Sequence, residues 1–323
     1  MSPKLKIIGE NLLLYSVAAA IIWYESRGLN YRKEIHDLSN IKFWWFLFAT
    51  LGSFAIWFFG ENLFFSRLFT RMHQRTGYIE LLPATCAAYF LQIISGLVAN
   101  GAFILFLHRR KKVPWFAAGF TMTFFGFIDG ILFSSFIAAA GFALPSSPIR
   151  TFSPYALGAL FAFMLIAAWW LWRKPGFRFE KWLYNRPSLM SFRKATPAVY
   201  GELLAIRFMI LAPQGLLFWM ALEAFNVHIP IAQVLAMTPG ILAVAGASIT
   251  PAGLGPMQAV AIHAFSHYAP ESKVMAATLA FSISHLLYRI PLGLGPAGVF
   301  VRQVLEAGGD LEKAEALVLH RAK

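Results

Sequence analysis

Long apolar runs separated by short polar segments make up most of this sequence. The runs span Ile7–Tyr24, Phe43–Phe65, Ile79–Leu107, Trp115–Ala143, Pro154–Trp172, Val199–Leu222, Ile231–Tyr268 and Val274–Leu294. They are rich in leucine, phenylalanine and alanine, and they lack the apolar–polar alternation of membrane-barrel strands. Because about 20 mostly apolar residues cross a bilayer as a helix, the pattern predicts an all-α polytopic membrane protein.

Two of the runs contain residues near their middle that break helices. Run 79–107 includes Ser95, Gly96, Asn100 and Gly101. Run 231–268 includes the segment TPAGLGP at residues 250–256, with two prolines and two glycines. Proline removes a backbone donor and clashes with the preceding turn, so a continuous helix is not expected there. We therefore predict a break in the middle of each run.

Lysine and arginine residues concentrate in alternate loops. The basic segments are 1–6, 66–78, 108–114, 173–198 and the tail after residue 294, whereas 144–153, 223–230 and 269–273 hold few basic residues and 25–42 is mixed. Loops rich in Lys and Arg stay on the cytoplasmic side. Both ends of run 79–107 are thus predicted to lie inside and both ends of run 231–268 outside. Each run is then a re-entrant helical hairpin; simple packing kinks in ordinary spans remain the alternative.

The predicted fold therefore has about six full spans plus two inverted re-entrant helical hairpins, with both termini cytoplasmic. Residues 1–303 form a single transmembrane domain, and residues 304–323 form a short cytoplasmic tail. Segments 43–143 and 199–303 have the same span–hairpin–span order in opposite orientations, which predicts an inverted repeat of the kind found in transporters. The expected location is the inner (plasma) membrane.

Composition narrows the classes of function. Hydrophobic residues make up 58% and charged residues 13% of the chain, and the mean hydropathy is +0.60. The net charge of +13 follows from the topology of the loops, so no nucleic-acid partner is expected. The single cysteine, Cys86, allows no disulfide within the chain. Nothing resembles a P-loop or a catalytic triad, and we expect neither a soluble synthase domain nor enzymatic activity.

The two breaks are the first candidates for a polar binding site. Irregular backbone at membrane depth is tolerated only where protein or a water-filled cavity satisfies its polar groups. Short helices that begin after each break would aim backbone N–H groups at an anionic headgroup. The candidate substrate-binding residues at the breaks are Gly96, Asn100, Pro251, Gly253, Gly255 and Gln258.

Ionisable residues inside the runs are the second set of candidates. Asp129, Arg207 and Arg289 are predicted to contact substrate, because charges inside a membrane usually serve a function. The alternatives are a structural ion pair for Asp129 and snorkelling to the interface for the two arginines. Glu61 lies near the predicted end of its run and is interpreted as interfacial. His263 and His267 are four residues apart, but no third ligand lies nearby, so neither a metal nor a cofactor is expected.

The C-terminal third of the chain resembles the lysylphosphatidylglycerol synthase transmembrane-region family, also called flippase-like domain proteins. The stretches TPGILAVAGASITPAGLGPMQAVAIHAF and ATLAFSISHLLYRIPLGLGPAGVF carry the resemblance. The family typically has a Pro-Gly-Gly-Leu-Gly element, then an acidic residue, and later an aromatic–Arg pair. The matching positions here are Pro251–Gly255, Gln258 and Tyr288–Arg289.

This sequence departs from the family pattern at charged positions. Ala252 replaces one glycine, and Gln258 stands where an acidic residue is usual. Asp129 matches the aspartate of the family's Glu-Arg-x-x-Asp pattern, but Phe125 and Gly126 replace its Glu and Arg. These changes affect headgroup contacts, so they leave the identity of the substrate open.

The resemblance implies two inverted hairpins and work on lipids. The expected function is a flippase or transporter of a lipid or lipid-linked carrier, with an anionic or phosphate-bearing headgroup held at the helix breaks. Two alternatives stay open. One is an intramembrane enzyme that acts on lipid headgroups, with Asp129 and the histidines as acid and base. The other is a non-transporting partner of a lipid-modifying enzyme, and homo-oligomers are also compatible with the sequence.

Overall fold

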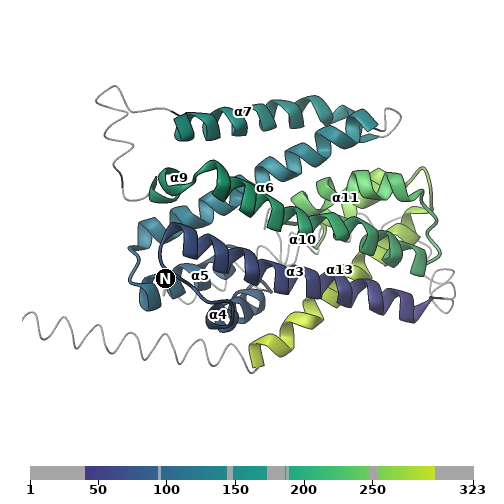
Figure 1. Ribbon diagram of the computed structural model, residues 1–323. Coiled ribbons are helices and arrows are strands. Elements are labelled where there is room, and N and C mark those ends of the chain that lie inside the picture. Colours follow the sequence, from purple (N-terminus) through teal and green to yellow (C-terminus); the bar gives the residue numbers. More distant parts are fainter. Residues whose placement is uncertain are drawn as a thin grey trace, which may run out of the picture.

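Helices account for all the regular structure in the part of the chain that the computed structural model describes, which is residues 41–93, 96–143, 148–172, 186, 189–246 and 254–294 (Figure 1). The elements are α3 (Phe43–Met72), α4 (Tyr78–Leu91), α5 (Gly96–Lys111), α6 (Trp115–Ala143), the short 3-10 helix η1 (Pro148–Thr151), α7 (Ser153–Trp172), α9 (Met190–Lys194), α10 (Pro197–Ala224), α11 (Ile231–Gly246), α12 (Pro256–Phe265) and α13 (Glu271–Leu294). The predicted all-α class is confirmed. The first predicted span, 7–24, lies outside the described residues.

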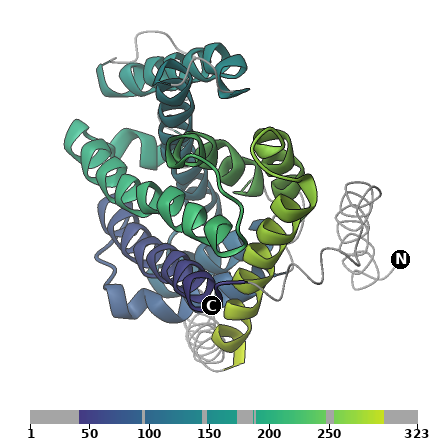
Figure 2. The same ribbon diagram turned by 90° about the vertical axis from the view of Figure 1, so that its right-hand side faces the viewer.

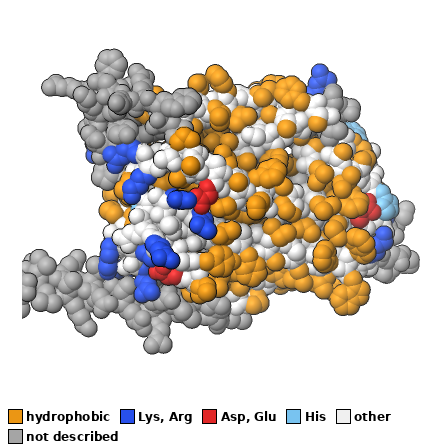
Figure 3. All heavy atoms as spheres, in the orientation of Figure 1, with side chains coloured by type: hydrophobic (Ala, Val, Ile, Leu, Met, Phe, Trp, Pro, Cys, Tyr) orange, Lys and Arg blue, Asp and Glu red, His pale blue; other side chains and the backbone are white. Residues whose placement is uncertain are grey.

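Four of these helices, α3, α6, α10 and α13, are long and apolar enough to cross a membrane. Shorter apolar helices lie at Tyr78–Leu91, Ser153–Trp169 and Ile231–Gly246. Large apolar side chains such as Trp44, Phe116 and Phe161 are exposed on the outside of the bundle. Figure 3 shows a broad apolar belt across the middle of the molecule. These features are those of a multi-pass membrane protein.

Basic side chains gather at one end of the molecule, as the loop pattern predicted. The last turns of α3, α5 and α9 carry them, for example Arg71, Lys111 and Lys194. In Figure 3 this end lies on the left, where α10 also begins. Few basic residues lie at the other end, among the described residues.

Both predicted helix breaks are present. The apolar run 79–107 is divided between α4, which ends at Leu91, and α5, which begins at Gly96. The run 231–268 is divided between α11, which ends at Gly246, and α12, which begins at Pro256. In each case the two short helices pack against each other.

The contacts of α4 and α5 with the long helices correspond to those of α11 and α12. α3 lies along α10, as Figures 1 and 2 both show. Gly60 permits this close approach, since a Cβ atom there would lie 2.5 Å from Ile210 Cγ1. Around this pair, α4 contacts α13 and α11 contacts α6; likewise α5 packs on α6 and α12 packs on α13. Each broken run therefore packs against the last long helix of the other half, which brings the two breaks toward each other.

Local sequence accounts for where the central helices begin. α10 starts with Thr196, whose side chain accepts a hydrogen bond from Val199 N at 3.3 Å, followed by Pro197 at the first helical position. α12 starts with Gly255 at φ 90°, followed by Pro256. Glycine adopts a positive φ at little cost, which is why the chain can turn sharply into α12.

Candidate functional site

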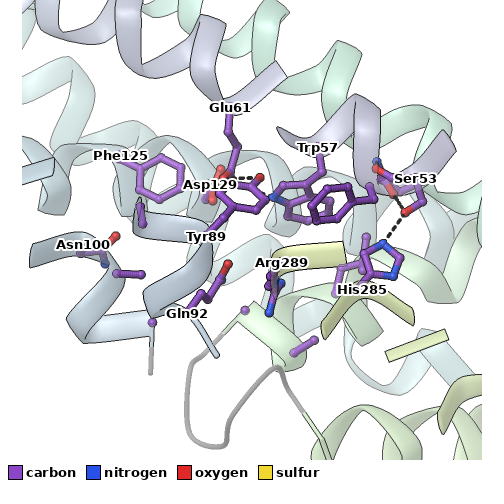
Figure 4. A pocket seen from close by; sticks show the side chains of 18 of the residues that line it. Ser53, Trp57, Glu61, Tyr89, Gln92, Asn100, Phe125, Asp129, His285 and Arg289 are labelled. Atoms are coloured by element: carbon purple, nitrogen blue, oxygen red, sulfur yellow. Dashed lines mark hydrogen bonds between the residues drawn. The ribbon is translucent and has the colours of Figure 1, made fainter. Parts of the chain in front are cut away.

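A cavity of about 210 Å³ lies where the two broken runs meet the long helices (Figure 4). Gln92 and Gly96 line it from the break between α4 and α5. Gly246 and Met257 line it from the end of α11 and the start of α12. α3, α6, α10 and α13 supply the remaining walls. The two helix breaks therefore contribute to one cavity.

Arg207 of α10 is a large and fully buried side chain of this cavity, with 2% of its surface exposed. Its Nε and Nη2 atoms donate to the two carboxylate oxygens of Asp129, over 2.5 and 2.8 Å. Its Nη1 atom donates to Glu61 Oε1 over 3.2 Å. The ring of Phe125 lies 5.0 Å from its Cζ atom. Arg207 is thus held by two carboxylates and an aromatic face.

Glu61 of α3 is the second carboxylate of this cluster. Besides Arg207, it accepts hydrogen bonds from Trp57 Nε1 at 2.7 Å and from the hydroxyl of Tyr89 at 2.8 Å. Figure 4 shows Glu61 and Tyr89 pointing toward Asp129. Three donors from three different helices thus reach the Glu61 carboxylate, counting Trp57 of its own helix α3, Tyr89 of α4 and Arg207 of α10. The cluster therefore consists of charges that satisfy one another.

Arg289 of α13 also lines the cavity, but its guanidinium makes fewer hydrogen bonds than that of Arg207. Its Nε and Nη1 atoms are shielded from solvent and have no hydrogen-bond partner among the described residues. The ring of Tyr89 lies 6.0 Å from its Cζ atom. Figure 4 shows Arg289 beside Gln92, at the edge of the cavity near the two breaks. An unpaired buried cation is costly unless an anion compensates it.

Neutral polar groups line the other side of the cavity. The hydroxyl of Ser53 lies 2.5 Å from Gln214 Oε1 and 3.1 Å from His285 Nε2. The other ring nitrogen of His285 bonds to the carbonyl of Phe281 at 2.9 Å. These groups offer donors and acceptors without a further fixed charge.

The structure brings five of the nine predicted site residues to this cavity. These residues are Gly96, Asn100, Asp129, Arg207 and Arg289. Two others, Pro251 and Gly253, lie outside the described residues. The last two, Gly255 and Gln258, are described but do not line the cavity.

Gln258 is fully buried behind the cavity wall. Its Oε1 atom accepts from the backbone N–H of Gly255 at 2.7 Å. Its amide nitrogen donates to the carbonyl of Thr278 at 3.2 Å and to the hydroxyl of Ser282 at 3.1 Å. Gln258 thus joins the start of α12 to α13, and its contacts are structural.

Glu61 is a cavity residue that the sequence interpretation did not include among the site candidates. It was expected at the membrane interface because its apolar run was judged to end at Phe65. Helix α3 continues to Met72, so Glu61 lies well inside the helix and faces the cavity. A signal was present in the sequence, since Trp57 lies one helical turn before it and can donate to it.

The two histidines singled out for metal binding lie elsewhere. His263 and His267 are both exposed. No group of three or more His, Cys, Asp or Glu side chains suited to a metal occurs in the described ranges.

Comparison with protein families gives a match over most of the chain. The model of the family described as "Lysylphosphatidylglycerol synthase TM region" matches residues 11–293. No curated protein matches the chain. The match extends well beyond the C-terminal third, where the sequence motifs lie.

Proposed function

Because the chain belongs to the lysylphosphatidylglycerol synthase transmembrane-region family, we propose that it is a flippase-like transporter of a lipid or lipid-linked carrier. The polar head of the substrate occupies the cavity between the two helix breaks. The hydrocarbon part stays in the apolar surroundings. The protein itself carries out no chemical conversion in this proposal.

The observation that carries the proposal is the guanidinium of Arg289, whose Nε and Nη1 atoms are buried without hydrogen bonds in the described part of the chain. Arg207 is saturated by Asp129 and Glu61, so it has little capacity left for a ligand. Arg289 presents two buried donors without partners among the described residues. A phosphate or carboxylate would accept both donors, because a planar guanidinium binds such groups bidentately. An anionic, phosphate-bearing headgroup is therefore the proposed ligand.

The proposed membrane arrangement follows the charges at the two ends. The basic end faces the cytoplasm. Helices α4 and α5 form a hairpin that enters from the cytoplasmic side, and α11 and α12 form one that enters from the opposite side. With the predicted first helix, the chain has six full spans and both termini inside. The corresponding contacts of the two halves support an inverted repeat of 43–143 and 199–303.

The geometry favours transport over headgroup chemistry. Asp129 is engaged on both oxygens by Arg207, so it is poorly placed to exchange a proton with a substrate. His263 and His267 are exposed and do not line the cavity. A non-transporting partner of a lipid-modifying enzyme would hold a lipid in the same way, so only a transport measurement separates the two roles.

The test is transport in liposomes that contain the purified protein and a tail-labelled fluorescent phosphatidylglycerol. A membrane-impermeant quencher reports movement between leaflets. We expect fast movement with the unmodified protein and a rate near that of empty liposomes with Arg289→Gln. Arg75→Gln, in an exposed loop, is the matched control and should transport normally. Lipid binding without any movement would assign the chain to the partner role.

A further inference from the structure

Beside the headgroup cavity lies a second cavity of about 250 Å³, bounded by α6, α10 and α11. These three helices pack against one another (Figure 1). Its lining is almost wholly apolar. The polar side chain there is Thr238, whose hydroxyl already donates to the carbonyl of Val234 at 2.7 Å. A site without free polar groups suits hydrocarbon and not a headgroup.

The two cavities adjoin each other. Phe133 of α6 and Leu242 of α11 line both of them. A molecule that fills the headgroup cavity therefore has an apolar space next to it, and Phe133 and Leu242 belong to the walls of both.

The same gradient from polar to apolar runs along two neighbouring helices. On α6, Asp129 faces the headgroup cavity, and Phe133, one turn later, lines both cavities. On α10, Arg207 faces the headgroup cavity, and Leu211, one turn later, lines the apolar one. Residues four apart lie on the same face of a helix. On each helix, therefore, the cavity lining changes from a charged to an apolar side chain within one turn.

The apolar cavity also reaches the outer surface of the bundle. Ala212 is exposed, and Leu235 has 42% of its surface exposed, although both line the cavity. The cavity is narrow between Gly215 and Leu235, because a Cβ atom at position 215 would lie 2.7 Å from Leu235 Cδ2. The absence of a side chain at Gly215 therefore keeps this part of the cavity open. A chain can therefore leave the cavity toward the bilayer without crossing a polar layer.

We propose that this space, the α6–α10–α11 groove, holds one hydrocarbon chain of the same lipid whose anionic head is bound at Arg289. The inference rests on the proposed function, and it fixes where the tail leaves the protein. It also defines the substrate class: an amphiphile with an anionic head and an acyl or isoprenoid chain joined directly behind it.

The test uses phosphatidylglycerol that carries a diazirine at the end of one acyl chain, in liposomes with the full-length protein. After illumination, the labelled peptides are identified by mass spectrometry. We expect adducts within 208–216 and 235–242. Arg289→Gln should lower these adducts by about 10-fold to 100-fold, since losing hydrogen bonds to a charged group costs about 1.5–3 kcal/mol.

A matched pair of variants tests the groove itself. Ala212→Trp places an indole at the mouth of the groove and should suppress the adducts. Leu216→Trp places the same group at another exposed position on α10, outside the groove lining, and should leave them unchanged. Groove adducts that persist in Arg289→Gln would show that the acyl chain enters the groove independently of Arg289, and they would overturn the inference. Adducts that lie elsewhere, but still depend on Arg289, would overturn the groove while sparing the proposed function.

Discussion

Arg207 of α10 holds Asp129 of α6 through two hydrogen bonds, with both side chains inside the helical bundle. The pattern of the family that the chain resembles has Glu and Arg where this chain has Phe125 and Gly126, on the same helix as Asp129. In this chain α10 supplies the guanidinium and α3 supplies a second carboxylate, Glu61. The cluster is therefore assembled across three helices instead of along one.

This cluster predicts that replacing Arg207 lowers the stability of the fold more than replacing Asp129. Arg207→Gln leaves Asp129 and Glu61 buried without their cation and should destabilise the fold by about 3–5 kcal/mol, as expected for a broken buried ion pair. Asp129→Asn leaves Arg207 paired with Glu61, so its cost should be smaller. Thermal unfolding in detergent measures both. Equal losses for the two single variants would contradict the three-residue cluster.

The membrane arrangement predicts labelling at opposite faces. In a Cys86→Ala background, a membrane-impermeant maleimide added to intact cells should modify His228→Cys. It should leave Arg110→Cys unmodified until the membrane is opened. The reason is that Arg110 ends α5 at the basic end, whereas His228 follows α10 at the other end. Labelling of Arg110→Cys from outside would contradict the hairpin formed by α4 and α5.

The turn into α12 predicts a requirement for glycine at position 255. Its φ of 90° is unfavourable for residues with a side chain, so Gly255→Ala should destabilise by about 1–3 kcal/mol. Gly240→Ala is the matched control within α11. A Cβ atom there meets nothing within 4 Å, so its stability should be equal or slightly higher. Thermal unfolding of both variants makes the comparison, and equal stability would mean that the turn is not strained.

His73 predicts a loss of stability in acid. Burial, and then the nearby charge of Lys194, lower the pKa of His73 from 6.5 to about 4. The unfolded chain therefore binds a proton more readily than the folded one, and stability should fall as the pH drops from about 6.5 to about 4. The ring also bonds Thr121 Oγ1 at 2.7 Å. Melting temperatures across this range should fall more steeply for the unmodified protein than for His73→Gln; parallel curves would exclude His73 as the cause.

Apolar runs and helix-breaking residues predicted most of the fold. The runs that fall within the described ranges correspond to helices or to pairs of short helices. α5 begins at Gly96 and α12 at Pro256, directly after Gly255, although Asn100 and Gly101 continue α5 and do not break it. Helix ends were predicted less well, because polar residues such as Arg67 and Arg71 continue α3 on its exposed side. Because of that error Glu61 was interpreted as interfacial, and its contact with Arg207 was not predicted.

The candidate site could be predicted only in part, since hydropathy does not tell which helix faces which. Asp129, Arg207 and Arg289 were recognisable as charges inside apolar runs. Their partners come from distant helices, so spacing predicts neither the pairing of Arg207 nor the two Arg289 nitrogens that have no hydrogen bond within the described ranges. Gln258 occupies a family position, yet its amide spans from α12 to α13 instead of facing the cavity. Such contacts depend on tertiary packing.

The central claim is that Arg289 binds the anionic head of a lipid, and native mass spectrometry of the purified protein tests it most directly. The account predicts a phosphate-bearing lipid retained by the unmodified protein, partial retention by Arg289→Lys, and little by Arg289→Gln, because a point charge replaces a bidentate fork only in part. The amount of folded protein should be similar in all three. Equal retention of the same lipid by Arg289→Gln would contradict the account.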